Sequence, residues 1–230
     1  TGEVTVWAGY SGHGKSLILG QVSNYFMRQF KQRICIASME MKPHLTLARM
    51  CRQSATMRPN VDYIQQFHKS TDNLLWMYDQ QGTIKGEKIA AIVRYTQDKF
   101  GVQHFIIDSL LKCGYAEDDY TGQKMFVDQI CAIARDTNVH IHLAHHSRKG
   151  HNEYNVPGKL DIKGTSSITD QVDNVIIVWR NKLKEQETNE GIFTKAAESD
   201  CILAVEKQRN GEWEGRIALW FNPTSMSYGE

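Results

Sequence analysis

Eight residues near the N-terminus have the types and spacing of a phosphate-binding loop. Residues 9–16 read Gly-Tyr-Ser-Gly-His-Gly-Lys-Ser and match G-x-x-x-x-G-K-[ST] at every fixed position. The glycines of such a loop let backbone N–H groups close around phosphate oxygens. Lys15 can reach the β- and γ-phosphates, and the Ser16 hydroxyl can bind Mg²⁺. The motif predicts a nucleotide site made of Gly9, Tyr10, Ser11, Gly12, His13, Gly14, Lys15 and Ser16.

Two carboxylates further along the chain could complete a hydrolytic site. Asp108 ends the apolar run Phe-Ile-Ile-Asp, as the acid of a Walker B strand does, and is our second candidate ligand for Mg²⁺. The alternative is an aspartate that caps the next helix. Glu40 follows another apolar run and could orient or deprotonate the attacking water. An ordinary carboxylate near a helix N-terminus explains Glu40 equally well from chemistry alone.

A histidine and a basic loop follow the apolar run at residues 139–144. His145 is placed to contact the γ-phosphate and to link it to the loop at residues 147–164. The neighbouring histidines do not predict a metal site, because alternate strand residues face opposite sides and no cysteine or carboxylate completes a ligand set. Cations with an interleaved tyrosine suit a phosphodiester backbone, although a solvated basic loop is the simpler interpretation. The loop cations are Arg148, Lys149, His151, Lys159 and Lys163.

A second cationic pair lies near the C-terminus, in Lys207-Gln208-Arg209-Asn210-Gly211. A lysine and an arginine two residues apart at a strand end project to the same side. An arginine finger that acts on a neighbouring subunit would explain the pair. Surface charges that flank a turn at Asn210-Gly211 are the alternative.

The elements that must position these residues alternate along the chain. Apolar runs at 4–8, 34–37, 74–78, 104–107, 139–144, 175–178 and 202–205 predict strands. Helical spacing between them predicts helices at 15–30, 44–54, 87–100 and 123–137, whereas the charged stretch 182–198 predicts a solvated hairpin or a mobile insertion. This alternation predicts an α/β fold whose mostly parallel central sheet is covered by helices on both faces. Ligands should then gather at the carboxyl ends of the strands.

Composition sets wider bounds. The chain has 230 residues and a net charge of +1, so its global charge does not indicate a nucleic-acid partner. No apolar run is long enough to span a membrane. Five widely spaced cysteines predict reduced thiols in a cytosol-like compartment rather than a zinc site. We expect one domain over residues 1–230, cut from the C-terminal part of a longer protein, because Thr1 is not a natural start.

In this order, these segments resemble the ATPase domain of the ring-shaped replicative helicases: DnaB, the phage primase–helicases and mitochondrial Twinkle. The resemblance covers nearly the whole chain. Residues 38–41 (Ser-Met-Glu-Met) resemble the family's Ser-Leu-Glu-Met, and residues 144–148 (Ala-His-His-Ser-Arg) resemble its sensor segment. DnaB has Gln at the position of His145, whereas phage primase–helicases have His. Lys-Gln-Arg-Asn-Gly at 207–211 is the most specific match.

The resemblance implies a RecA-like P-loop NTPase core that uses ATP or another NTP with Mg²⁺. It implies Glu40 as the catalytic glutamate, Arg209 as the trans arginine finger with Lys207 beside it, and Arg180 and Phe221 as residues that flank the base. Residues 161–166, including Lys163 and Gly164, resemble the segment that closes the DNA-binding loop.

For function, the resemblance implies NTP-driven translocation on single-stranded DNA by a homohexamer, in the cytoplasm of a bacterial or phage-infected cell. Primase and polymerase are candidate partners, and no membrane is involved. Two alternatives remain open: a RecA-like DNA-dependent ATPase without unwinding activity, and an inactive helicase-derived binding module.

Overall fold

The protein is built around one large sheet, and its computed structural model describes residues 1–116, 118–147, 153–158, 161–162 and 166–230. The strands lie in the order β3-β2-β4-β5-β1-β6-β7-β8-β9. Their bounds are β1 (Val4–Gly9), β2 (Ile34–Ser38), β3 (Leu75–Tyr78), β4 (His104–Asp108), β5 (His140–His146), β6 (Asn174–Arg180), β7 (Cys201–Gln208), β8 (Gly215–Asn222) and β9 (Ser227–Gly229). The helices are α1 (Lys15–Phe30), α2 (Pro43–Ala55), α3 (Val61–Thr71), α4 (Gly86–Phe100), α5 (Tyr120–Thr137), α6 (Ser166–Gln171) and α7 (Lys182–Asn189), with a short 3₁₀ turn at Leu110–Lys112.

Strand direction decides where the chain can build a site. From β3 to β6 every neighbouring pair is parallel, whereas β7, β8 and β9 extend the sheet with antiparallel pairs. The carboxyl ends of β1, β2, β4 and β5 therefore meet at one edge. The register there pairs Ser38 with Asp108 and Gly9 with His146.

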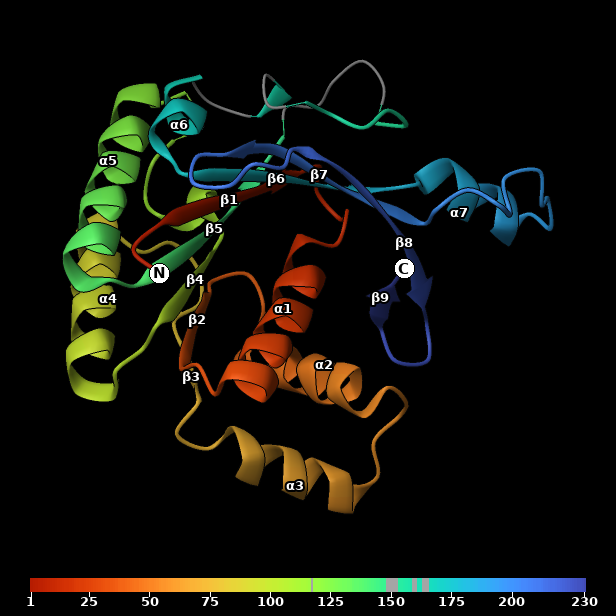
Figure 1. Cartoon of the computed structure of the whole chain (residues 1–230), viewed down its shortest axis with the longest axis horizontal. Helices are drawn as coiled ribbons and strands as arrows, with labels where there is room; N and C mark the ends of the chain where they lie inside the picture. The colour runs from red at the N-terminus through yellow and green to blue at the C-terminus, as the bar shows by residue number, and fades with distance from the viewer. Residues whose placement is uncertain (117, 148–152, 159–160, 163–165) are drawn as a thin grey trace.

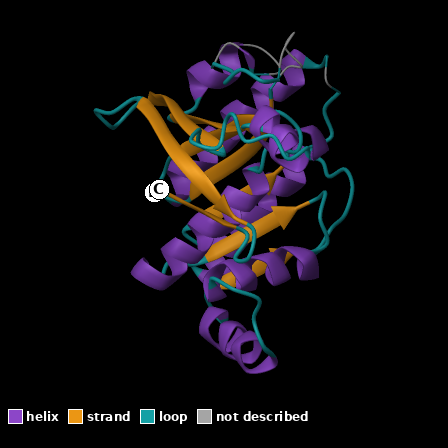
Figure 2. Cartoon of the chain, turned by 90° about the vertical axis from the view of Figure 1, so that its right-hand side faces the viewer, coloured by secondary structure: helices purple, strands orange, loops and turns teal. Residues whose placement is uncertain are grey.

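Helices cover both faces of this sheet. Alternation along β1 sends Val4, Val6 and Ala8 into the core under α4 and α5, while Trp7 packs on the opposite face with residues of α1 and α2. Figure 1 shows α4 and α5 on one side of the sheet and α1 and α2 on the other. Figure 2 shows the twisted strands of the sheet with helices packed around them. The prediction of a mostly parallel sheet covered on both faces is confirmed.

One difference from the sequence prediction lies after β6. The stretch 182–198 is solvated as expected, but the prediction of a hairpin or mobile insertion was wrong, because its first half is helix α7. Asn181 starts this helix, and its side-chain oxygen accepts a hydrogen bond from the Lys184 backbone N–H at 3.0 Å. The helix buries none of its residues, so it has no apolar stripe from which its period could be recognised.

A buried polar chain crosses the sheet beneath α1. The Trp7 indole Nε1–H donates to His142 Nδ1 at 3.2 Å, and His142 Nε2 lies 3.1 Å from His104 Nδ1. Because an indole can only donate, His142 carries its proton on Nε2 and donates it to His104. His104 Nε2 then donates to Gln32 Oε1 at 3.1 Å. This direction of donation requires both imidazoles to be neutral.

We expect these buried hydrogen bonds to make the stability of the fold sensitive to mild acid. Burial lowers the pKa of His104 to about 4 and that of His142 well below its usual value. The unfolded state therefore takes up protons first, so stability is complete above pH 6.5 and falls as the pH drops from 6.5 towards 4. His104 alone should lower the free energy of unfolding by roughly 3 kcal/mol once the pH has fallen to the bottom of this range.

Denaturant unfolding at a series of pH values measures this effect. His104→Gln should reduce the slope of unfolding free energy between pH 6.5 and 5, whereas His68→Gln, at an exposed position, should leave it intact. An unchanged slope in His104→Gln would contradict the assignment.

Candidate active site

The phosphate-loop motif forms the turn between β1 and α1, as the sequence predicts. A Cβ on Gly9 would stand 2.3 Å from the Val178 carbonyl oxygen of β6, so only glycine fits where the loop leaves the sheet. Gly14 begins α1 with a φ of 91°, in the left-handed region that favours glycine. The Gly9 carbonyl also accepts a hydrogen bond from the Ser147 N–H at 3.0 Å, which fastens the end of β5 to the loop.

Lys15 turns back into this loop. Its ammonium donates to the carbonyls of Gly9 at 2.9 Å and Tyr10 at 3.0 Å. Burial lowers the pKa of Lys15 to about 8, against the opposing pull of the Asp108 and Glu40 carboxylates. The side chain is therefore mostly charged at neutral pH, inside the loop that would hold phosphate.

Ser16 and Asp108 meet as a pair of oxygen ligands. The Ser16 hydroxyl at the start of α1 donates to Asp108 Oδ2 at 2.5 Å, at the end of β4. Asp108 is buried, and this burial raises its pKa despite the hydrogen bond from Ser16. A hydroxyl beside a carboxylate at a phosphate loop fits Mg²⁺, which prefers hard oxygen ligands.

Glu40 lies next to this pair, although it is distant in sequence. The Met39 N–H donates to the Asp108 carbonyl at 3.0 Å, which holds the segment after β2 against the end of β4. The Ser109 hydroxyl donates to Glu40 Oε1 at 2.9 Å. Glu40 itself is exposed, so a carboxylate that could serve as a base faces solvent beside the buried Asp108.

His145 reaches the same edge from a central strand. It is fully buried and pairs in register with Ala8, the residue before the phosphate loop. The strand extends beyond Ala144 to His146, two residues past the predicted end. His145 thus lies within a strand rather than after it, between the loop motif and the segment that begins at Ser147.

Arg180 and Phe221 form a neighbouring platform connected to the loop. The Arg180 guanidinium lies 5.9 Å from the centre of the Phe221 ring, and its Nη2 donates to Glu185 at 2.7 Å. The Arg180 backbone N–H donates to His13 Nδ1 at 3.0 Å. Burial lowers the pKa of His13 to about 4, so it stays neutral and accepts this bond. The predicted base-flanking pair therefore lies together.

Lys207 and Arg209 lie at the opposite edge of the sheet. Because β7 is antiparallel to β6, Gln208 pairs with Asn174, which pairs with Thr5 at the start of β1. The phosphate loop begins at the other end of that strand, roughly 15 Å away at about 3.3 Å per residue. Arg209 therefore cannot complete the phosphate site of its own chain.

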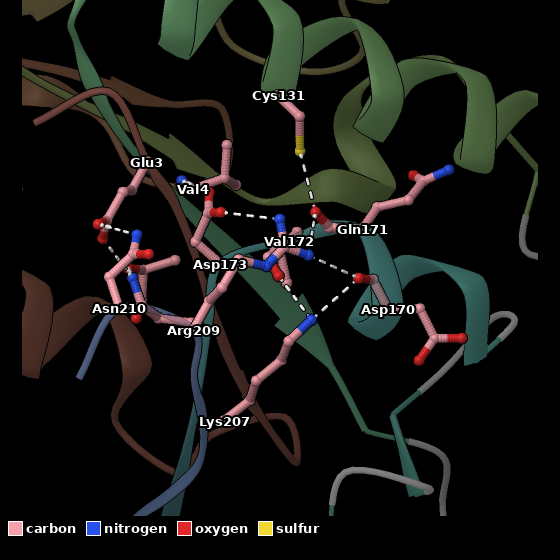
Figure 3. Close-up of polar contacts among 12 residues, drawn as sticks. Glu3, Val4, Cys131, Asp170, Gln171, Val172, Asp173, Lys207, Arg209 and Asn210 are labelled. Carbon is pink, nitrogen blue, oxygen red and sulfur yellow. Dashed lines mark hydrogen bonds and ion pairs between the residues drawn. The ribbon is translucent and has the colours of Figure 1, made fainter. Parts of the chain in front are cut away.

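Both cations instead contact the end of α6 (Figure 3). Lys207 Nζ donates to the carbonyls of Thr169, Asp170 and Val172 at 2.7 to 2.9 Å. The two side chains do share one side, as predicted.

The candidate DNA residues Arg148, Lys149, Lys159, Lys163 and Gly164 lie outside the described residues. Around them, Ser147 forms an isolated bridge with Ile162, and the Gly158 N–H donates to Asp161 at 2.9 Å. The segment thus leaves from the end of β5 and returns beside it.

Arg49 on α2 also reaches this site, although it was not among the predicted site residues. Arg49 lines a small cavity together with Ser16 and Asp108. Burial lowers the pKa of the Arg49 guanidinium, while the nearby Asp108 carboxylate opposes that shift. Which face of α2 points at β4 depends on tertiary packing, so no local signal marks this arginine.

The described part of the chain shows neither a preformed metal cluster nor a membrane span. It contains no group of three or more His, Cys, Asp or Glu side chains arranged to hold a metal. No helix in those residues is long and apolar enough to cross a membrane. All five cysteines are buried and free.

The chain as a whole is similar to a known protein family. The family model for the DnaB-like helicase C-terminal domain matches residues 1–230. No curated protein matches the chain.

Two solved structures share the fold. One, described as an ATPase domain, superposes with a TM-score of 0.80 at 16% identity, over 98% of this chain and 84% of that one. A DnaB-like replicative helicase, described with its interactions with primase, gives a TM-score of 0.78 at 15% identity. This second match covers 99% of the present chain, which spans only 57% of that helicase. The predicted RecA-like architecture is confirmed.

Proposed function

The chain belongs to the DnaB-like helicase C-terminal domain family, and from this membership we propose that it is the motor domain of a replicative DNA helicase. It hydrolyses ATP with Mg²⁺ and uses the energy to move along single-stranded DNA and separate a duplex. Its working form is a homohexameric ring in the cytoplasm of a bacterial or phage-infected cell. Primase and polymerase are candidate partners, and a similar structure that describes a helicase with primase supports the first of them.

One observation carries the proposal: the residues needed for hydrolysis occur at opposite edges of the sheet. Lys15, Ser16, Glu40 and Asp108 gather at the carboxyl edge. Arg209 lies beyond the start of β1. A ring of identical subunits with head-to-tail interfaces brings these two edges together at every interface. This arrangement favours the helicase motor over an inactive binding module.

We assign the steps to these groups. The γ-phosphate lies against Lys15, and water attacks its phosphorus while the bond to the β,γ-bridging oxygen breaks. Glu40 accepts the proton of that water, and ADP and phosphate leave. Mg²⁺ held by Ser16 and Asp108 would neutralise charge on the β- and γ-phosphate oxygens. His145 contacts the γ-phosphate, and Arg180 and Phe221 flank the base.

The neighbouring subunit supplies the last charges. Its Arg209, with Lys207 beside it, offsets the negative charge that spreads over the γ-phosphoryl oxygens in the transition state.

DNA engagement is assigned to the basic loop at 147–164. We expect single-stranded DNA to stimulate ATP hydrolysis several-fold and the oligomeric protein to displace a duplex strand. Replacing Lys149, Lys159 and Lys163 together by alanine should abolish the stimulation and lower the salt dependence of DNA binding, because three phosphate contacts are lost. Hydrolysis without DNA is the reference measurement.

These assays of hydrolysis and strand displacement also test the alternatives. Stimulated hydrolysis with no strand displacement would favour the RecA-like ATPase without unwinding activity. Full stimulation of the triple variant, or binding that ignores salt, would contradict the loop assignment.

A further inference from the structure

Asp173 lies just after α6 and joins two parts of the chain. Its backbone N–H donates to the Val4 carbonyl at 3.1 Å, and its Oδ2 accepts from the Val4 N–H at 2.9 Å. On the other side, its carbonyl accepts from the Arg209 N–H at 2.9 Å, and its Oδ1 accepts from Arg209 Nη1 at 3.1 Å. Two hydrogen bonds therefore hold each neighbour (Figure 3).

The Asp173–Arg209 pair is buried at one end only. The Asp173 side chain is 7% exposed and that of Arg209 is 41% exposed. Such a pair is stronger than a surface ion pair, because the carboxylate is shielded from water and already fixed by the Val4 N–H. The exposed guanidinium is thus held, through Asp173, at the start of β1.

A second set of contacts fixes the plane of the guanidinium. Arg209 Nη2 donates to the Asp170 carbonyl at 3.0 Å and the Gln171 carbonyl at 3.4 Å, at the end of α6. Helix ends leave carbonyls without helical partners, so these acceptors are available. Among the described residues no acceptor is found for Nε, and an arginine has five N–H donors. Donors remain to bind an anion outside the subunit.

We propose that Asp173 is a positioning residue that holds Arg209 ready for the nucleotide of the neighbouring subunit, an inference that rests on the proposed function. A free arginine would lose its rotamer freedom on every engagement with a phosphate. Asp173 removes that loss in advance by fixing the side chain while donors stay exposed. The same carboxylate binds Val4, so the arginine is fixed to the strand that carries its own subunit's phosphate loop.

Asp173→Asn tests the proposal in the oligomeric protein. The amide is isosteric and can still accept from the Val4 N–H, but it has no charge for Arg209. We expect kcat for ATP hydrolysis to fall about tenfold with KM unchanged, because ATP binds to an intact loop. The matched control is Asp136→Asn, which removes the partner of Arg94 in an exposed ion pair between α4 and α5 and should retain wild-type kinetics. A kcat within twofold of wild type in Asp173→Asn would overturn the proposal.

Mixed oligomers separate positioning from a purely structural role. Glu40→Gln subunits keep Asp173 and Arg209, so beside an Asp173→Asn subunit they restore a complete site on its phosphate loop. Activity of the mixture should exceed the average of the two parents several-fold. If Asp173 served only to hold β1 of its own subunit, Asp173→Asn subunits would stay impaired beside any neighbouring subunit.

A parallel mixture of Arg209→Ala with Glu40→Gln distinguishes a failure of the proposed positioning by Asp173 from a failure of the proposed trans action of Arg209. Recovery there but not with Asp173→Asn overturns the role of Asp173 alone. Recovery in neither mixture, with assembly verified by sedimentation, overturns the trans action of Arg209 and this inference with it. If Asp173→Asn does not assemble, Asp173→Glu takes its place in both assays, because it keeps the charge but displaces it by one methylene.

Discussion

Replacing Arg209 by alanine is expected to lower kcat for ATP hydrolysis by about 10³- to 10⁵-fold, the range typical of arginine fingers. The physical reason is that charge builds up on the γ-phosphoryl oxygens in the transition state, and removing the guanidinium leaves only Lys207 of this cationic pair to offset it. ATP binding should persist, since the phosphate loop lies at the far edge of the same subunit.

Steady-state kinetics with a separate measurement of nucleotide affinity test this expectation. Arg209→Lys is the matched variant: it keeps a positive charge but loses the planar fork, so it should recover only a small part of the rate. Because Arg209 contacts α6, thermal unfolding must show that the alanine variant is folded. A folded, assembled variant with kcat near wild type would remove Arg209 from the mechanism.

Glu40→Gln should lower kcat by about 10²- to 10⁴-fold, as expected for loss of a positioned base. Glutamine is isosteric, and its carbonyl oxygen can still accept from the Ser109 hydroxyl, so the loop geometry is kept. What is lost is the ability to take a proton from water.

Single-turnover hydrolysis measures the effect apart from binding and product release. Asp79→Asn is a suitable control, because it removes a carboxylate from the neighbouring β3 end without touching the site. Rapid hydrolysis in Glu40→Gln would show that Glu40 is not the base, whereas equally slow hydrolysis in the control would show that the loss of rate is not specific to Glu40.

Local sequence patterns predicted the elements that consecutive residues encode. The phosphate loop, β1 and α1 agree with prediction because a glycine turn between a buried strand and an amphipathic helix is encoded in consecutive residues. Strand β5 extends further than predicted because its polar end residue His146 pairs with Gly9, a tertiary contact that hydropathy does not record. Helix α7 was missed because charged residues on all sides hide its period.

The candidate site divides in the same way. Ser16 and Asp108 could be paired from sequence because each ends a recognisable motif and parallel strands bring such ends together. Arg49 could not, since its approach to Asp108 depends on how α2 packs. Nor could the hold of Asp173 on Arg209, which joins residues 36 positions apart through an antiparallel extension of the sheet.

We propose that each phosphate loop is half of an active site and that a second copy of the chain supplies the other half. A mixture of Arg209→Ala subunits with Glu40→Gln subunits is the decisive experiment. Neither parent has a complete site, but random assembly at equal ratio makes about a quarter of the interfaces complete in a closed ring. We expect ATP hydrolysis that is absent from both parents and greatest near equal ratio. No recovery at any ratio, with mixed oligomers verified, would contradict it.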